Sequence, residues 1–182
     1  MIETLKKKLS HITLPLAGIV EESVVDGTGL RTTIFVQGCP HQCKGCHNPS
    51  AWEFSGGQKF TLAELFDKVQ SNPLLSGITL SGGEPFCYAK ELAVLSQAVR
   101  ELGLNVWCYT GYTLAELQEK AQSDLSTKKL LDQIDVLVDG PFIESQKSGL
   151  LKFRGSNNQR IIDLNSMRTQ NTQAVILLFP GQ

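Results

Sequence analysis

Short apolar runs alternate along this chain with stretches that carry an apolar residue every three or four positions. The runs are rich in β-branched and aromatic residues, which predicts strands at residues 30–37, 77–80, 104–109, 134–138, 160–162 and 174–179. Helical spacing predicts helices over residues 61–72, from 85 to 103, from 113, near 128–132 and over 163–169. Two of these helices begin with a capping box, Thr61 to Glu64 and Thr113 to Glu116.

Strands that alternate with helices indicate βαβ units, so we expect an α/β fold with a mostly parallel sheet. About six strands are too few for a closed eight-stranded barrel, which favours a partial, open barrel of the (β/α)6 type. At 182 residues the chain is the size of one domain. We expect an N-terminal arm over residues 1–16 and the domain over 17–182. Residues 142–158 lack periodicity and predict a long loop.

Charge and composition exclude several classes of protein. The formal net charge of -1 gives no general attraction to nucleic acid or to an anionic membrane, so neither is expected as a partner. The apolar run near the N-terminus holds a proline and is far shorter than a membrane span. Three of the 5 cysteines share one loop, unlike a secreted disulfide framework. We therefore expect a cytoplasmic, soluble protein.

The cysteine loop directly follows the strand expected at 30–37 and holds Cys39, Cys43 and Cys46 in the spacing C-x3-C-x2-C. Soft thiolate ligands select iron–sulfur clusters, zinc or Cu(I). A 4Fe–4S cluster with three cysteine ligands keeps one iron open for another group. A structural zinc would need a fourth ligand, such as His41, His47 or a distant cysteine. The spacing leaves both readings open.

The other two cysteines have a simpler interpretation. Cys108 falls in the middle of an expected strand, and Cys87 falls where a helix begins. We expect both to be buried, inert thiols outside the site.

Further polar or glycine-rich turns follow the expected strands. Gly82-Gly83-Glu84 comes after residues 77–80, Thr110 after 104–109 and Asp139 after 134–138. Ligands of parallel α/β sheets gather at the carboxyl ends of strands. Each turn taken singly has an ordinary structural explanation, but their shared position favours an active site over a structural metal.

Together these motifs resemble the radical SAM enzymes, in which the three cysteines bind a 4Fe–4S cluster and a Gly-Gly-Glu turn contacts S-adenosylmethionine. Within that superfamily the chain is most similar to activators of glycyl-radical enzymes. The resemblance covers roughly residues 20–162 and rests on Asp26-Gly27-x-Gly29-x-Arg31, Phe35-Val36-x-Gly38-Cys39, Cys46-His47-Asn48, Trp52, Ser81-Gly82-Gly83-Glu84-Pro85, Tyr109-Thr110-Gly111-Tyr112, Val138-Asp139-Gly140 and Arg154-Gly155-Ser156-x-Asn158-Gln159.

The resemblance implies a role for each site residue. Cys39, Cys43 and Cys46 ligate the cluster, and Asp26 is catalytic, holding the main chain of the substrate. The S-adenosylmethionine site is formed by Gly45, Gly82, Gly83, Glu84, Thr110 and Asp139.

The implied reaction is reductive cleavage of S-adenosylmethionine to make a glycyl radical on a partner protein. The partner would be a glycyl-radical enzyme, and Arg154-Gly155-Ser156-x-Asn158-Gln159 favours the large subunit of anaerobic ribonucleotide reductase. A flavodoxin or ferredoxin would donate the electron.

Alternative functions for this chain are an activator of the pyruvate formate-lyase type, a radical SAM enzyme acting on a small molecule, and a zinc-stabilised binding module without catalysis. A simple ferredoxin-like carrier is disfavoured, because three cysteines leave its cluster incomplete.

Overall fold

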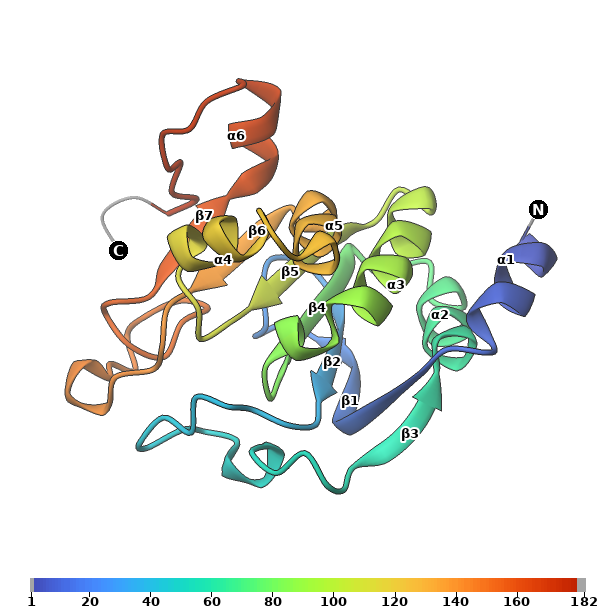
Figure 1. Ribbon diagram of the computed structural model, residues 1–182, viewed down its shortest axis with the longest axis horizontal. Helices are drawn as coiled ribbons and strands as arrows, with labels where there is room; N and C mark the ends of the chain where they lie inside the picture. The colour runs from blue at the N-terminus through green and yellow to red at the C-terminus, as the bar shows by residue number, and fades with distance from the viewer. Residues whose placement is uncertain (1, 180–182) are drawn as a thin grey trace.

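A computed structural model describes residues 2–179 and shows one seven-stranded sheet with helices packed on it (Figure 1). The strands lie in the order β3-β1-β2-β4-β5-β6-β7. Their bounds are β1 Thr13–Ser23, β2 Arg31–Val36, β3 Gln58–Thr61, β4 Gly77–Gly82, β5 Asn105–Tyr109, β6 Val136–Asp139 and β7 Arg160–Asp163.

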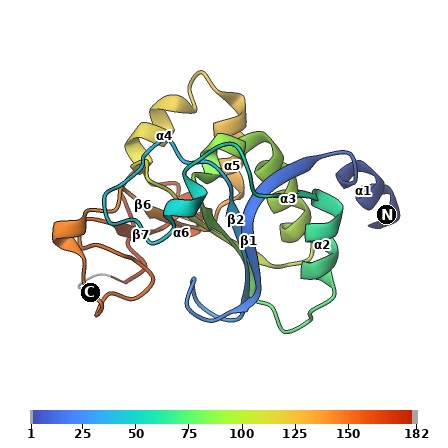
Figure 2. The same cartoon turned by 90° about the horizontal axis from the view of Figure 1, so that it is seen from below.

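Six α-helices are described, α1 Ile2–Leu9, α2 Leu62–Gln70, α3 Ala89–Glu101, α4 Leu114–Lys120, α5 Leu125–Gln133 and α6 Leu164–Thr169, together with short 3-10 turns at Pro49–Ala51, Pro85–Tyr88 and Glu144–Gln146. Helices α2 to α5 line one face of the sheet (Figures 1 and 2). Both predicted capping boxes are confirmed, since Thr61 and Thr113 exchange hydrogen bonds with the third residue of α2 and α4. Over residues 2–179, no helix has the length and apolar character that crossing a membrane requires.

The expected α/β class is confirmed, but the mostly parallel sheet is not, because the sheet is mixed. β2, β4, β5 and β6 run parallel, whereas β1 pairs antiparallel with β2 and β3, and β7 pairs antiparallel with β6. The connections explain the difference. Helices cross between the parallel strands, while the β1–β2 and β6–β7 connections contain no α-helix to carry the chain back in the same direction. The expected partial barrel is likewise not confirmed.

The two faces of the sheet are covered differently, because successive side chains of a strand point to opposite sides. One face carries Ile34 and Val36 of β2 and their counterparts on the neighbouring strands, and it packs against the helices as the main core. The opposite face carries Arg31, Thr33 and Phe35 of β2, with Trp107 and Tyr109 of β5. A smaller cluster lies on this face around Trp107.

Two stretches of the chain differ from expectation. The final strand predicted over residues 174–179 is wrong, since only a single bridge joins Leu177 to Ile162 and Val175 and Leu177 are exposed. Leu178 and Phe179 instead pack against the small cluster on the open face of the sheet. β1 and β3 had not been predicted, and the boundary expected at residue 16 falls inside β1.

Candidate active site

The carboxyl ends of β2, β4, β5 and β6 meet at one edge of the sheet, because these four strands are parallel neighbours. The cysteine loop follows β2, the Gly-Gly-Glu turn ends β4, Thr110 follows β5, and Asp139 ends β6. The structure therefore brings the sequence-predicted turns to a common edge. They differ in what their side chains contact there.

Cys39, Cys43 and Cys46 are all partly exposed on the loop that leaves β2. Left-handed residues turn this loop between the cysteines, with φ of 46° at Gln42 and 75° at Gly45. Within residues 2–179, no three or more His, Cys, Asp or Glu side chains are grouped to hold a single metal ion. An iron–sulfur cluster bonds each thiolate to a different iron, so its ligands need not converge on one point.

Backbone amides of the loop are placed to stabilise thiolates. The amide of Asn48 donates to Cys46 Sγ at 3.4 Å. Burial raises the pKa of the Cys39 thiol, while hydrogen bonds from the backbone of His41 and Gln42 act in the opposite direction. Hydrogen bonds to ligand sulfur are a usual means of tuning iron–sulfur centres. The donor set and its surroundings therefore fit a 4Fe–4S cluster.

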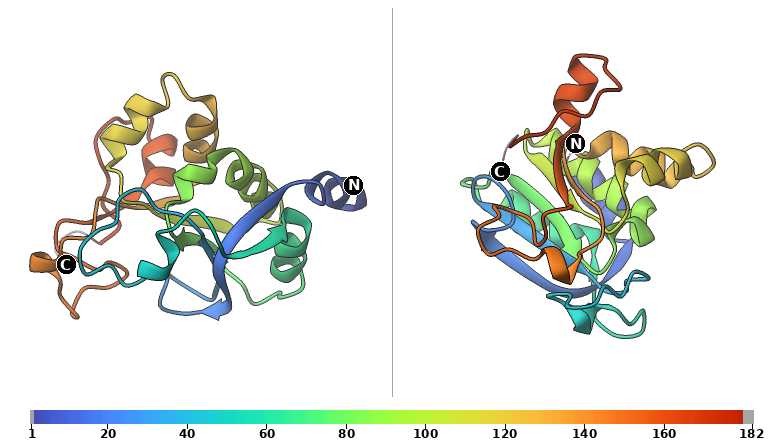
Figure 3. Two further views of the ribbon diagram at one scale, coloured as in Figure 1. Left: turned by 60° about the horizontal axis from the view of Figure 1, so that its bottom comes forward. Right: turned by 90° about the vertical axis from the view of Figure 1, so that its left-hand side faces the viewer.

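The segment 142–158 lies against the cysteine loop, and both occupy the same end of the molecule (Figures 1 and 3). Lys44 forms an ion pair with Glu144 at 3.2 Å, and the ring of His47 lies 5.3 Å from that of Phe142. A β-carbon on Gly45 would come within 2.9 Å of the Glu144 carboxylate. Glu144 thus fills the space that a side chain at position 45 would need.

Glu84 is fully buried and ties the cysteine loop to the turn after β5. Its Oε1 accepts hydrogen bonds from the Phe86 amide at 3.0 Å and the Thr110 hydroxyl at 2.9 Å. Its Oε2 accepts from the Gly111 amide at 2.9 Å and lies 2.9 Å from His41 Nε2. A carboxylate has about four acceptor sites, so this network occupies them all. His41, a possible zinc ligand from the sequence, contacts Glu84 instead of joining the cysteines.

The glycines before Glu84 allow two backbones to approach closely. A β-carbon on Gly83 would lie 2.1 Å from the carbonyl oxygen of Gly38, and one on Gly82 would lie 2.5 Å from backbone atoms of Phe35. The Gly83 amide donates to the Val36 carbonyl at 2.7 Å. These glycines therefore pack the β4 turn against the start of the cysteine loop, in addition to any ligand they contact.

The turn at Asp26 folds back under the open face of the sheet. The β-carbon missing from Gly27 would meet the Trp107 ring at 2.8 Å, and buried Arg31 donates to the Thr28 carbonyl at 3.0 Å. Asp26 Oδ2 accepts from Ser23 Oγ at 2.5 Å and from Thr33 Oγ1 at 3.0 Å. No hydrogen bond to Asp26 Oδ1 comes from any residue that the structure describes.

A cavity of about 400 Å³ brings three predicted site residues together. Asp26, Cys46 and Gly82 all line it, so the Asp-Gly turn, the cysteine loop and the Gly-Gly-Glu turn face one space. The segment 142–158 contributes Phe142, Leu151, Phe153, Arg154 and Gly155 to its wall. Phe153 adopts φ of 55° and packs edge-on against Trp107.

The remaining predicted site residues do not line this cavity. Thr110 is committed to Glu84, and buried Asp139 pairs with Arg160 while accepting the Leu114 amide at 2.8 Å. Asp139 thus anchors the start of α4 to β7.

The burial expected for the two remaining cysteines is confirmed for Cys108 alone. Cys108 is buried, and burial raises the pKa of its thiol well above the usual value. The expected burial of Cys87 is wrong, because the residue lies exposed in a 3-10 turn. Partial desolvation of its sulfur and the nearby Glu84 charge raise its pKa to about 11, so the thiol stays protonated at neutral pH.

Tyr109, Phe35 and Ser81 also line the cavity and were not predicted. Alternation along the strands could have indicated them, since all three point to the face that the helices do not cover. The sequence signal would have been aromatic and hydroxyl side chains at alternate strand positions. The sequence does not say which face of the sheet is open, because that depends on where the helices pack.

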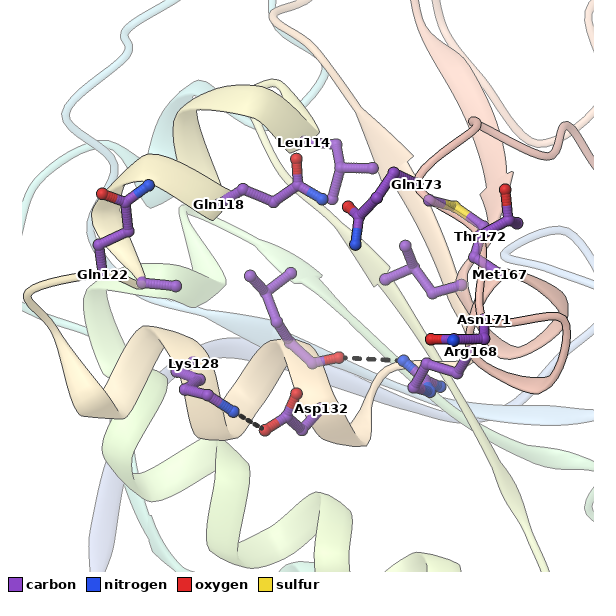
Figure 4. Close-up of a pocket in the computed structure, with 13 residues that line it drawn as sticks. Leu114, Gln118, Gln122, Lys128, Asp132, Met167, Arg168, Asn171, Thr172 and Gln173 are labelled. Carbon is purple, nitrogen blue, oxygen red and sulfur yellow. Dashed lines mark hydrogen bonds and ion pairs between the residues drawn. The ribbon is translucent and has the colours of Figure 1, made fainter.

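A second hollow of about 580 Å³ lies between α4, α5 and α6 (Figure 4). Two interactions cross its wall, since Lys128 pairs with Asp132 and Arg168 donates to the Leu131 carbonyl. None of the sequence-predicted site residues lines it.

Comparison with known proteins places these features in a family. Residues 25–162 match the family described as a 4Fe-4S single cluster domain. An anaerobic ribonucleoside-triphosphate reductase-activating protein from Vibrio cholerae is 45% identical over 148 residues, covering 76% of this chain and 90% of that protein. Proteins of the same name from Escherichia coli K12 and phage T4 are 38% and 33% identical, each over 75% of this chain and over 90% and 86% of their own length.

Among solved structures, QueE from Escherichia coli aligns with 59% of this chain and 57% of its own. The sequence identity is 19% and the TM-score is 0.45, a likeness too weak to define the fold.

Proposed function

The chain belongs to the family of anaerobic ribonucleoside-triphosphate reductase-activating proteins, and on that premise we propose that it activates such a reductase by generating a glycyl radical on it. Cys39, Cys43 and Cys46 hold a 4Fe–4S cluster and leave one iron open for S-adenosylmethionine. When bound, the cluster would supply the electron for reductive cleavage of S-adenosylmethionine and so for removal of a hydrogen atom from a glycine of the partner. A flavodoxin or ferredoxin is the proposed source of that electron.

In this proposal the turn after β4 binds the methionyl end of S-adenosylmethionine. The Gly82 and Gly83 backbone contacts the ligand, and Glu84 takes its ammonium group by exchanging the hydrogen bond that it now shares with His41. Thr110 and Asp139 support the S-adenosylmethionine site indirectly. Thr110 holds Glu84 in position, and Asp139 holds the start of α4. Gly45 contributes only backbone contacts, because it has no side chain.

The single observation that carries the proposal is the cavity shared by Asp26, Cys46 and Gly82. This shared lining supports Asp26 as a carboxylate that acts beside the cysteine loop and the Gly-Gly-Glu turn. One oxygen of Asp26 is held by two hydroxyls, so the carboxylate is fixed in orientation and its other oxygen can accept a main-chain N–H. A glycine of the substrate polypeptide suits this place, because no side chain shields its α-carbon.

The test is anaerobic incubation of the purified protein with S-adenosylmethionine, dithionite and anaerobic ribonucleoside-triphosphate reductase, read by electron paramagnetic resonance. We expect a glycyl radical on the reductase. Asp26→Ala should keep the cluster spectrum and S-adenosylmethionine binding and lose at least about 90% of the radical yield, a roughly ten-fold effect. A radical on pyruvate formate-lyase instead would assign a different partner, and no radical on either enzyme would contradict the proposed function.

A further inference from the structure

We infer that Tyr109 binds the substrate polypeptide together with Asp26, its hydroxyl donating a hydrogen bond to the main-chain carbonyl of the segment that presents the glycine. The inference rests on the proposed function and deepens it, since it names a second group that recognises the substrate. The Tyr109 hydroxyl would add a hydrogen-bond donor to the acceptor that Asp26 provides.

Tyr109 occupies the position that this role requires. It is the last residue of β5 and pairs with Val138 of β6, so the sheet fixes its backbone. Its side chain lies on the open face and lines the same cavity as Asp26 and Gly82. Neighbouring Trp107 and Val138 belong to the small apolar cluster against which Tyr109 packs. The ring is therefore held by rigid elements, while the hydroxyl is left for another partner.

The hydroxyl of Tyr109 accepts or donates no hydrogen bond within the part of the chain that the structure describes. The residue is only partly buried and lines the cavity, so the hydroxyl is open to a ligand that enters there. Burial, and secondarily the negative charge of Asp26, raises the pKa of Tyr109 above its usual value. The group thus stays protonated at neutral pH and can act as a donor.

Asp26 and Tyr109 offer the cavity an acceptor and a donor, which together match one peptide unit. Asp26 Oδ2 is held by Ser23 and Thr33, which leaves Oδ1 as an acceptor. Tyr109 supplies a donor, and a main chain carries one N–H and one carbonyl for each residue. The surrounding wall includes three apolar rings, those of Phe35, Phe142 and Phe153. A peptide group that entered such a wall without hydrogen-bond partners would lose much of its binding energy, so this pair selects main chain.

Tyr109→Phe removes only the hydroxyl and keeps the ring in the cluster. Tyr112→Phe is the matched control, because Tyr112 contacts the His41 ring at 4.5 Å and does not line the cavity. Both variants are purified with their clusters and compared with wild type in three measurements. These are the cluster spectrum, the affinity for S-adenosylmethionine, and the rate of glycyl-radical formation as a function of reductase concentration.

We expect Tyr109→Phe to raise the reductase concentration for half-maximal rate about ten-fold, equivalent to about 1.4 kcal/mol, with a smaller change in the rate at saturation. The cluster spectrum and S-adenosylmethionine affinity should match wild type, and Tyr112→Phe should match it in all three. Combining Tyr109→Phe with Asp26→Asn should give less than the product of the single effects, because both groups bind one substrate segment.

Three results would overturn the inference. An unchanged dependence on reductase concentration would show that the hydroxyl does not contact the polypeptide. Weaker S-adenosylmethionine binding in Tyr109→Phe would assign the hydroxyl to that ligand. Loss of the cluster would assign it a structural role. If the wild-type protein forms no glycyl radical, the proposed function fails and this inference fails with it.

Discussion

Glu84 shows how the structure changes the interpretation of a single motif residue. The sequence indicated a carboxylate free to bind a ligand, but its four hydrogen bonds join the cysteine loop, through His41, to the turn after β5. The residue therefore has a structural role as well as its proposed ligand role. Any ammonium group that binds it must replace an existing donor, so the affinity for S-adenosylmethionine reflects an exchange of partners.

At the scale of single residues, we also expect the three loop cysteines to be the only protein ligands of the cluster. Replacing Cys39, Cys43 or Cys46 with Ala removes a thiolate, and we expect loss of the cluster absorbance and a large fall in bound iron and sulfide. Cys87→Ala and Cys108→Ala are the controls and should retain both. Loss of the cluster in either control would contradict three-cysteine ligation.

At the scale of elements, the β4 turn and the cysteine loop are packed backbone to backbone. Gly83→Ala places a β-carbon 2.1 Å from the Gly38 carbonyl oxygen, so one backbone must move. We expect the free energy of unfolding to fall by roughly 1–3 kcal/mol and the reconstituted cluster content to fall as well. Denaturant unfolding and iron analysis measure the two effects.

Gly149→Ala is the matched control for that substitution, because no atom lies within 4 Å of the added β-carbon. It should leave stability and cluster content close to wild type. A Gly83→Ala protein of normal stability and normal cluster content would show that the turn can yield without disturbing the loop. Weaker S-adenosylmethionine binding in such a protein would then be assigned to the ligand alone.

The stability of the whole molecule should depend on carboxylates that cap its helices. Hydrogen bonds from the Thr61 and Thr113 backbone lower the pKa of Glu64 and Glu116, and the Thr127 hydroxyl lowers that of Asp124. A pKa lowered by folding gives stability that is complete above the unfolded values, near 4.5 for Glu and 3.8 for Asp, and is lost as the pH falls through the folded values.

We therefore expect the free energy of unfolding to decline as the pH falls below about 4.5, measured by denaturant titration at a series of pH values. Substituting both Glu64→Gln and Glu116→Gln should make that decline shallower, because two of the groups no longer titrate. An equal decline in the double variant and wild type would place the acid sensitivity elsewhere in the molecule.

Local sequence signals fixed most of the individual elements. The capping boxes at Thr61 and Thr113 start helices where predicted, and the strands expected at 30–37, 77–80, 104–109 and 134–138 are present within a few residues. These signals succeed because a cap or a strand pattern acts over a few neighbouring residues. Residues 174–179 show where these local signals fail. An apolar run has the same composition whether it pairs as a strand of the sheet or packs its side chains on a face of the sheet.

The sequence by itself determined the chemistry available to this protein: three thiolates on one loop, a glycine turn before Glu84, and the edge at which parallel strands end. Only the tertiary structure decided which groups act together. The fold brings Tyr109 of β5 and Asp26 of the β1–β2 turn to one cavity, while it commits Thr110 to Glu84 and Asp139 to Arg160. The reason is physical, because a residue's type and its neighbours set its reactivity, whereas its partners depend on strand direction and on which face of the sheet the helices leave open.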